Sequence, residues 1–136
     1  MVSVLQLNAL CNSIYTQLGP SHSECVYQTA LVLELYNLSA KSVESEKHVP
    51  VFYIDSNNTQ HTIGSERIDI LVRFDTGVIF LIELKAVANM NKQNVEQQIN
   101  KYEKSLHTLN IFPTYKIAVN FPQQLDKKEV DFVHII

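Results

Sequence analysis

Glycine and proline are scarce in this sequence, with 3 and 4 residues respectively among 136, and no low-complexity tract or internal repeat is present. Hydrophobic residues make up 46% of the chain and charged residues 18%, which is ordinary for a folded protein and unlike a disordered one. The length is close to the commonest size of a domain. We therefore expect one globular domain that spans residues 1–136.

Cysteine is rare as well. Cys11 and Cys25 match neither a CxxC pair nor a zinc-ligand spacing, and each lies in a helix-like apolar pattern. We expect both to be buried small hydrophobic side chains in a reducing compartment. The five histidines show no ligand spacing, and the sequence has no glycine-rich phosphate loop and no GxSxG elbow.

Long hydrophobic runs are also missing. The most apolar segment, 78–84, contains Glu83 and is far too short to span a bilayer, and the amino terminus does not resemble a secretory signal. We therefore expect a soluble intracellular protein, cytoplasmic or nuclear, with no membrane partner. The net charge of -3 argues against a protein that passively coats DNA. It argues less against a nuclease, because bound metal neutralises acidic residues locally.

Two helices are predicted at the start of the chain. Apolar residues recur at helical spacing over residues 3–18, and Gly19-Pro20 ends this pattern because proline cannot continue a helix. A second helix is expected from 21 to about 38. Its start has the spacing of a capping box, in which Ser21 is the N-cap and Glu24 bonds back to it.

The rest of the chain changes to a strand period, returns to a helix and ends in strands. Asp75-Thr76-Gly77 is a tight turn, which makes the strands on either side of it an antiparallel hairpin. The resulting order, α-α-β-β-β-α-β-β, predicts an α/β fold in which helices flank a mixed sheet. We expect strands at 48–54, 67–74 and 78–87, a helix at 92–109, and strands at 114–120 and 130–135.

Charged side chains gather within two of these strands. Strand alternation places Glu83 and Lys85 on one face, roughly 7 Å apart, and Asp69 lies in the neighbouring strand of the hairpin. Two converging carboxylates suit Mg²⁺ or Mn²⁺, and an adjacent lysine can orient water or neutralise charge on a phosphate. The alternative is a set of partly exposed ion pairs on a solvated sheet face.

An Asp followed, after a hairpin, by Glu-x-Lys on an apolar strand resembles the PD-(D/E)XK nuclease superfamily. The matching segments here are Arg67-Ile68-Asp69 and Ile82-Glu83-Leu84-Lys85-Ala86-Val87. The segment from Gly19 to Tyr27, GPSHSECVY, resembles the signature of the GxxExxY family within that superfamily. The resemblance covers most of residues 10–121 and implies a restriction-endonuclease-like core of α-β-β-β-α-β order.

The resemblance also implies roles for individual residues. Asp69 and Glu83 are expected to bind the metal, with the Leu84 main-chain carbonyl as a third ligand, and Lys85 to be the catalytic lysine. Glu24 matches the glutamate of the family signature, although a capping residue needs no catalytic role. Ser21 replaces the glycine of the signature, which puts any close approach of a ligand to the backbone there in doubt.

Further candidates lie on the two helices that flank the strands. Tyr27 is one turn beyond Glu24 and shares its face. Gln98 and Tyr102 resemble the QxxxY element of related nucleases, with Gln97 as an alternative in register, although Tyr102 also fits the apolar stripe. These candidates are predicted to act at the site or bind substrate, together with Lys101 on the same helix.

Two functions of different classes follow from the sequence. The first is a metal-dependent nuclease that acts on nucleic acid, DNA in preference to RNA. The second is a catalytically inactive module of the same fold that binds nucleic acid or protein. A domain of this size is compatible with action as a homodimer or beside a larger protein, and the last strand, 132–136, is either a pairing edge or tucked into the sheet.

Overall fold

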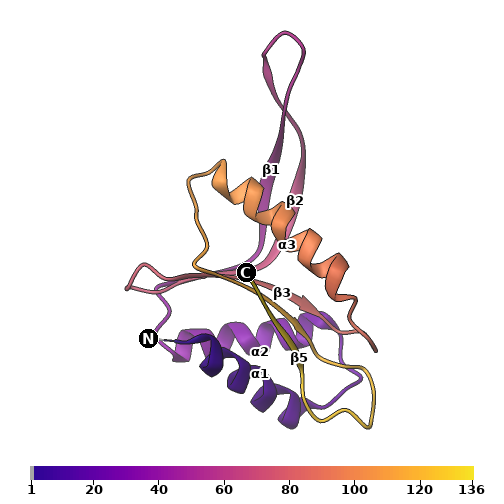
Figure 1. Ribbon diagram of the computed structural model, residues 1–136. Helices are drawn as coiled ribbons and strands as arrows, with labels where there is room; N and C mark the ends of the chain where they lie inside the picture. The colour runs from indigo at the N-terminus through magenta and orange to yellow at the C-terminus, as the bar shows by residue number, and fades with distance from the viewer. Residues whose placement is uncertain (1) are drawn as a thin grey trace.

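The computed structural model describes residues 2–136, which contain three helices and five strands (Figure 1). Their order along the chain is the one predicted from the sequence. The elements are α1 (Val4–Leu18), α2 (Glu24–Asn37), β1 (Ser42–Ile54), β2 (Gln60–Arg73), β3 (Ile79–Lys85), α3 (Lys92–His107), β4 (Tyr115–Asn120) and β5 (Asp131–Ile135).

A five-stranded mixed sheet forms the middle layer, with strand order β1-β2-β3-β4-β5. Neighbouring strands are antiparallel except for β3 and β4, which are parallel. A parallel pair needs a long crossover, since the chain must return to the same end of the sheet, and α3 supplies it. In Figure 1, α1 and α2 cover one face of the sheet and α3 lies over the other. The predicted α/β fold with a mixed sheet is confirmed.

The alternation predicted for β3 divides its side chains between two hydrophobic cores. Phe80, Ile82 and Leu84 pack in the core on the side of α1 and α2, while Ile79 and Leu81 pack in the core beneath α3. The alternative of partly exposed ion pairs on a solvated sheet face therefore does not hold for Glu83, which is 3% exposed. Because α3 covers the second face, the charges within β3 lie at the edge of a core rather than on an open surface.

The strands β1 and β2 continue well beyond the sheet as a twisted arm, which projects at the top of Figure 1. Their pairing runs from Ser42 and Arg73 to Ile54 and Gln60, with one bulge next to Phe52. The predictions of 48–54 and 67–74 were too short by several residues each. An arm exposed on most of its surface needs no apolar alternation, so its polar residues carry no strand signal.

The start of α2 differs from the prediction. Its N-cap is Ser23, and the proposed capping box between Ser21 and Glu24 is absent. Ser21 instead has a φ of 76° and donates its backbone N–H to Gln123 Oε1 at 2.7 Å. Cys25 is exposed rather than buried, because the inward face of α2 carries other side chains, whereas Cys11 in α1 is buried as expected. The inward residues of α2 are Tyr27, Gln28, Leu31 and Leu35.

The other element boundaries agree with the predictions to within two residues. The third strand ends at Lys85 rather than Val87, because the Asn120 side chain takes over the backbone bonds there. Its amide oxygen accepts from the Val87 N–H and its amide nitrogen donates to the Val87 carbonyl, both at 3.0 Å. Across residues 2–136, no helix combines the length and apolar character that a membrane crossing requires.

Candidate functional site

Asp69 lies at the point where the pairing between β2 and β3 ends. The last paired residues are Ile70 and Ile82, and beyond them Asp69 Oδ2 accepts a hydrogen bond of 2.8 Å from the backbone N–H of Leu84. The carboxylate thus takes the place that a main-chain carbonyl would have in a longer ladder. Asp69 is only 3% exposed. The end of the ladder therefore fixes a buried carboxylate beside β3.

Glu83 is the second buried carboxylate, also 3% exposed. Within residues 2–136 its Oε2 atom has no hydrogen-bond partner. An unpartnered charged oxygen at such depth is costly, so the native protein favours the protonated form. Burial, together with hydrogen bonding to Asp69 and the negative charge of Asp69, raises the pKa of Glu83 to about 9. The direction of this shift favours a proton on Glu83 in the metal-free protein.

Lys85 supplies the positive charge next to this pair. It ends β3, and its side chain is 28% exposed, so it connects the buried carboxylates with the surface. Its Nζ lies 3.9 Å from Glu83 Oε1, which is beyond a normal hydrogen bond. The ammonium group opposes the rise in the pKa of Glu83 without abolishing it. Lys85 is thus near enough to act on charge at the site and is not locked into a tight ion pair.

Glu24, at the first turn of α2, faces the same cluster from the neighbouring layer. Its side chain makes no hydrogen bond to any residue in 2–136, so it has no capping role. Burial is the main cause that raises the pKa of Glu24, followed by the negative charge of Asp69, while Lys85 and Arg67 lower it. These influences place Glu24 within electrostatic reach of Asp69 and Lys85.

Gln98 and Tyr102 approach the carboxylates from α3. Gln98 Nε2 donates a hydrogen bond of 2.6 Å to the Tyr102 hydroxyl. Tyr102 is 4% exposed and packs in the core beneath α3. Burial, and then the negative charge of Glu83, raise the pKa of Tyr102 to about 12. Of the two glutamines considered in the sequence, Gln98 therefore has a contact that leads to the site, whereas Gln97 is exposed.

The donor chemistry of this cluster fits Mg²⁺ or Mn²⁺. Two carboxylates converge, and Glu83 Oε2 is unpartnered and so available as a ligand. No group of three or more His, Cys, Asp and Glu side chains within residues 2–136 is arranged around a common metal position. Two carboxylates agree with the usual coordination of Mg²⁺, which is often bound by one or two acidic side chains and keeps several water ligands.

The family model of the PD-(D/E)XK nuclease superfamily matches residues 3–132. The chain belongs to this superfamily. Nucleases of the superfamily generally use Mg²⁺ or Mn²⁺ and act on nucleic acid. The fold is also similar to the crystal structure of SSO0001, with a TM-score of 0.51 and 18% sequence identity. That match covers 98% of this chain and 66% of the SSO0001 chain. A search of curated protein sequences gives no match.

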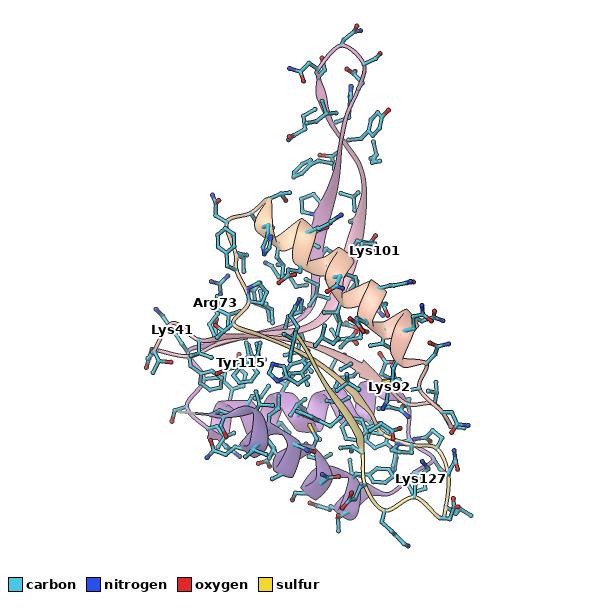
Figure 2. All side chains as sticks on the ribbon, viewed as in Figure 1. Lys41, Arg73, Lys92, Lys101, Tyr115 and Lys127 are labelled. Atoms are coloured by element: carbon cyan, nitrogen blue, oxygen red, sulfur yellow. The ribbon has the colours of Figure 1, made fainter. Side chains whose placement is uncertain are left out.

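The restriction-endonuclease-like class expected from the sequence agrees with these similarities. In this superfamily member, however, two of the predicted substrate-binding residues are already engaged. Tyr27 is fully buried, donates its hydroxyl to the Gly19 carbonyl at 2.6 Å, and stacks on Phe121 with ring centroids 4.3 Å apart. Lys101 is exposed on α3 (Figure 2) and pairs with Glu66 at 3.2 Å. Tyr27 thus holds the α1–α2 junction, and Lys101 lies on the outer surface.

Two residues that the sequence did not single out support the site. Gln123 donates to the Tyr27 hydroxyl at 3.2 Å and accepts from the Ser21 N–H, so it ties the start of α2 to the end of the sheet. Glu46, with a φ of 53°, interrupts the β1–β2 ladder opposite Asp69 and pairs with Arg67 at 3.5 Å. Neither carries a sequence signal, because both act through partners distant in the chain.

Proposed function

We propose that the chain is a metal-dependent nuclease, acting as one domain, that hydrolyses phosphodiester bonds in nucleic acid. Within the superfamily we assign it to the GxxExxY group, on the 19–27 segment and on the placement of Glu24 beside the cluster. The observation that carries the proposal is the buried pair of Asp69 and Glu83, with an unpartnered oxygen and Lys85 alongside. Charged groups at this depth are costly, so a structural role alone does not account for them.

Each residue has a role in this proposal. Asp69, fixed by the Leu84 N–H, and Glu83, through its free Oε2, hold Mg²⁺ or Mn²⁺ together with the Leu84 carbonyl. The metal, when bound, polarises a phosphoryl oxygen and lowers the pKa of a coordinated water. Lys85 Nζ orients the attacking water and stabilises the negative charge that develops on the phosphate.

Two more side chains complete the arrangement. Glu24 accepts hydrogen bonds from water beside the two carboxylates, and Gln98 orients the Tyr102 hydroxyl over them. In this proposal the negative charge that holds the metal comes mainly from Asp69 and Glu83.

We propose DNA as the substrate in preference to RNA, and an intracellular location. Because the domain is small, action as a homodimer or beside a larger partner is also part of the proposal.

The first test is a cleavage assay with labelled single- and double-stranded DNA and RNA, in Mg²⁺, Mn²⁺ or EDTA. Wild-type protein should cleave at least one substrate in metal and none in EDTA. Glu83→Gln should be inactive, whereas Glu129→Gln, in an exposed loop, should match wild type. Cleavage by Glu83→Gln at the wild-type rate contradicts the proposed site, and metal-independent cleavage contradicts the proposed chemistry.

The acidic net charge of -3 favours a second candidate, a catalytically inactive module of the same fold that binds nucleic acid or protein. Such a module needs no metal at Asp69 and Glu83. The two candidates therefore differ in whether Mn²⁺ stabilises the folded protein, since a ligand that binds only the native state raises its apparent stability.

A further inference from the structure

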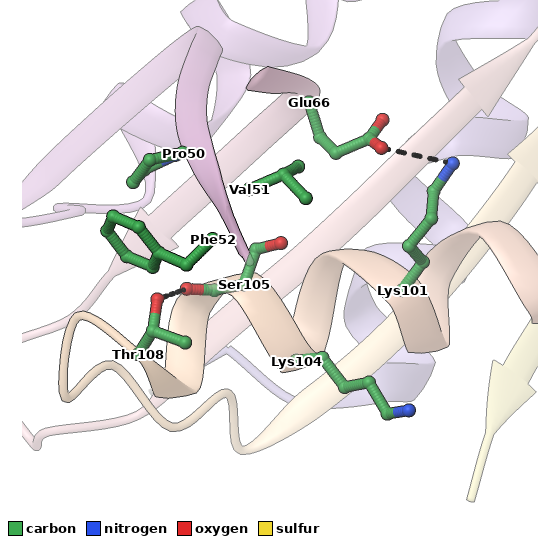
Figure 3. Close-up of a pocket in the computed structure, with 8 residues that line it drawn as sticks. All are labelled: Pro50, Val51, Phe52, Glu66, Lys101, Lys104, Ser105 and Thr108. Atoms are coloured by element: carbon green, nitrogen blue, oxygen red, sulfur yellow. Dashed lines mark hydrogen bonds and ion pairs between the residues drawn. The ribbon is translucent and has the colours of Figure 1, made fainter. Parts of the chain in front are cut away.

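A cavity of about 240 Å³ lies outside the carboxylate cluster, between the root of the β1–β2 arm and α3 (Figure 3). Phe52, Pro50 and Val51 from β1 form one wall, and Lys101, Lys104 and Ser105 are among the residues of α3 that form the other. The arm exists beyond the sheet only because β1 and β2 are longer than the other strands. The cavity is thus a consequence of this chain's long hairpin.

Hollows on α3 extend from the cavity toward Gln98. Two hollows share Lys101 with the cavity, and one of them is also lined by Gln98. Gln98 in turn donates to the Tyr102 hydroxyl, which lies within electrostatic reach of Glu83 and Asp69. These hollows form a surface furrow along α3 that runs from the arm root to Gln98.

The chemistry of the cavity is divided between an apolar wall and a cationic rim. The half-buried Phe52 ring presents a flat apolar surface of the kind on which nucleobases stack. Lys104 makes no ion pair with any residue in 2–136, so its ammonium group is free to meet a phosphate. Lys101 is held by Glu66 at 3.2 Å at the same rim. An aromatic wall with adjacent cations suits a base and its phosphate.

We propose that this cavity binds one unpaired nucleotide of a nucleic-acid strand whose backbone follows the furrow toward the carboxylate cluster. The inference rests on the proposed nuclease function and adds a substrate class to it, because a base can stack on Phe52 only after it has left its own helix. Single strands meet this condition without cost, whereas a duplex has to be opened first. The cavity therefore selects single-stranded nucleic acid or an unpaired end.

Glu66 restrains this binding site. Its carboxylate neutralises Lys101 and repels an incoming phosphate, so a bound strand has to break the Lys101–Glu66 pair. Glu66→Gln keeps the shape of the side chain and removes the charge. This variant should bind a strand more tightly than wild type, which a purely structural role for Glu66 does not predict.

The test measures binding of short fluorescein-labelled oligothymidylate and oligouridylate by full-length protein in EDTA, where metal-dependent cleavage is silent. Phe52→Leu keeps an apolar side chain but removes the stacking surface, and should weaken binding by about fivefold or more. Phe52→Tyr keeps an aromatic ring and should therefore bind as tightly as wild type. Lys104→Ala should weaken binding and reduce the salt dependence by about 0.7 in the log–log slope. Glu66→Gln should strengthen binding.

Matched controls are residues that do not line the cavity. Phe112→Leu changes an exposed aromatic near the end of α3, and Lys127→Ala changes a lysine in the loop far from the arm (Figure 2). Both should bind like wild type. The proposal is overturned if Phe52→Leu and Lys104→Ala match these controls while remaining folded, or if a blunt duplex binds as tightly as the single strands.

The same proteins, assayed for cleavage in Mn²⁺, separate this inference from the proposed function. If the wild-type protein cleaves but Phe52→Leu and Lys104→Ala bind strands as tightly as wild type, the nucleotide-binding role of the cavity is rejected. The proposed nuclease function is then retained. If binding depends on Phe52 and Lys104 but no substrate is cleaved, the proposed nuclease function is rejected. The nucleotide-binding role of the cavity is then retained. Tighter binding of oligothymidylate or of oligouridylate identifies which sugar and base the cavity accepts.

Discussion

At the scale of single residues, Asp69 has a structural task and, in the proposed function, a chemical one as well. Its carboxylate closes the β2–β3 ladder by accepting from the Leu84 N–H, and the same group faces the proposed metal position. Substitutions that remove only one of these two tasks should affect stability and activity differently. The comparison of an isosteric with a truncating substitution can therefore separate the fold of the site from its chemistry.

We predict that Asp69→Ala lowers the free energy of unfolding in EDTA by about 1–3 kcal/mol, because it leaves the buried Leu84 N–H unpaired. Asp69→Asn retains an oxygen that can accept from this N–H, so it should be close to wild type in stability. Both variants should be inactive. Urea unfolding followed by circular dichroism provides the measurement, and equal losses of stability in the two variants would contradict the structural task.

Glu83 gives a prediction that depends on pH. Its folded-state pKa is about 9 against an ordinary value of 4.5. Above about pH 4.5 the unfolded chain loses this proton while the native protein keeps it, so the native state binds more protons. The contribution of Glu83 to stability is therefore complete below pH 4.5 and is lost progressively as the pH rises to about 9.

Glu83→Gln should remove this dependence in metal-free protein. Since Gln imitates the protonated acid, we expect the variant to be more stable than wild type at pH 8 by at least about 1.4 kcal/mol, the equivalent of one pKa unit. Unfolding in EDTA at pH 5 and pH 8 checks this. The exposed Glu129→Gln serves as the control, and a variant less stable than wild type at pH 8 would refute the protonated pair.

At the scale of elements, the sequence predicts best those features that depend on local periodicity. The helix pattern of residues 3–18 and the alternation in β3 predicted these elements correctly. They also placed Asp69 in the strand next to that of Glu83 and Lys85. The prediction failed where a partner distant in the chain decides the local structure. Ser21 is fixed by Gln123, 102 residues away, so no local signal could reveal its positive φ.

The arm was missed for a related reason. Backbone pairing between β1 and β2 maintains it, and most of its side chains face solvent, so the sequence there has no alternation. An element of this kind contributes little to the cores. Its tip is closed by Asp55, whose side chain accepts from the N–H groups of Asn57 and Thr59 at 2.8 and 3.0 Å.

We therefore predict that the tip of the arm is dispensable for folding. Replacement of residues 54–60 by Asn-Gly would close the hairpin at the Tyr53–His61 pair with a two-residue turn. The free energy of unfolding should change by less than about 1 kcal/mol, since the removed side chains are surface residues. The metal response should be unchanged, and a large loss of stability would show that the tip packs on the body.

At the scale of the whole molecule, the charge distribution predicts that the proposed site depends on a cation. The chain carries a net charge of -3, and Glu24 lies within electrostatic reach of the buried pair of Asp69 and Glu83. Lys85 offsets only part of this charge. In the metal-free protein the remaining repulsion is relieved by the proton on the pair, so a divalent ion should bind the native state in place of that proton.

Mn²⁺ should consequently raise the midpoint of thermal unfolding of wild-type protein and of Glu129→Gln. Linkage gives a stabilisation of about 2.7 kcal/mol when the free ion is at 100 times its dissociation constant. Asp69→Asn, which keeps the Leu84 bond but loses a charged ligand, should lose most of this response. If wild-type protein is folded and its midpoint of thermal unfolding is the same in Mn²⁺ as in EDTA, the two carboxylates do not form a metal site. The fold would then serve as the binding module instead, because a nuclease of this chemistry cannot act without the ion.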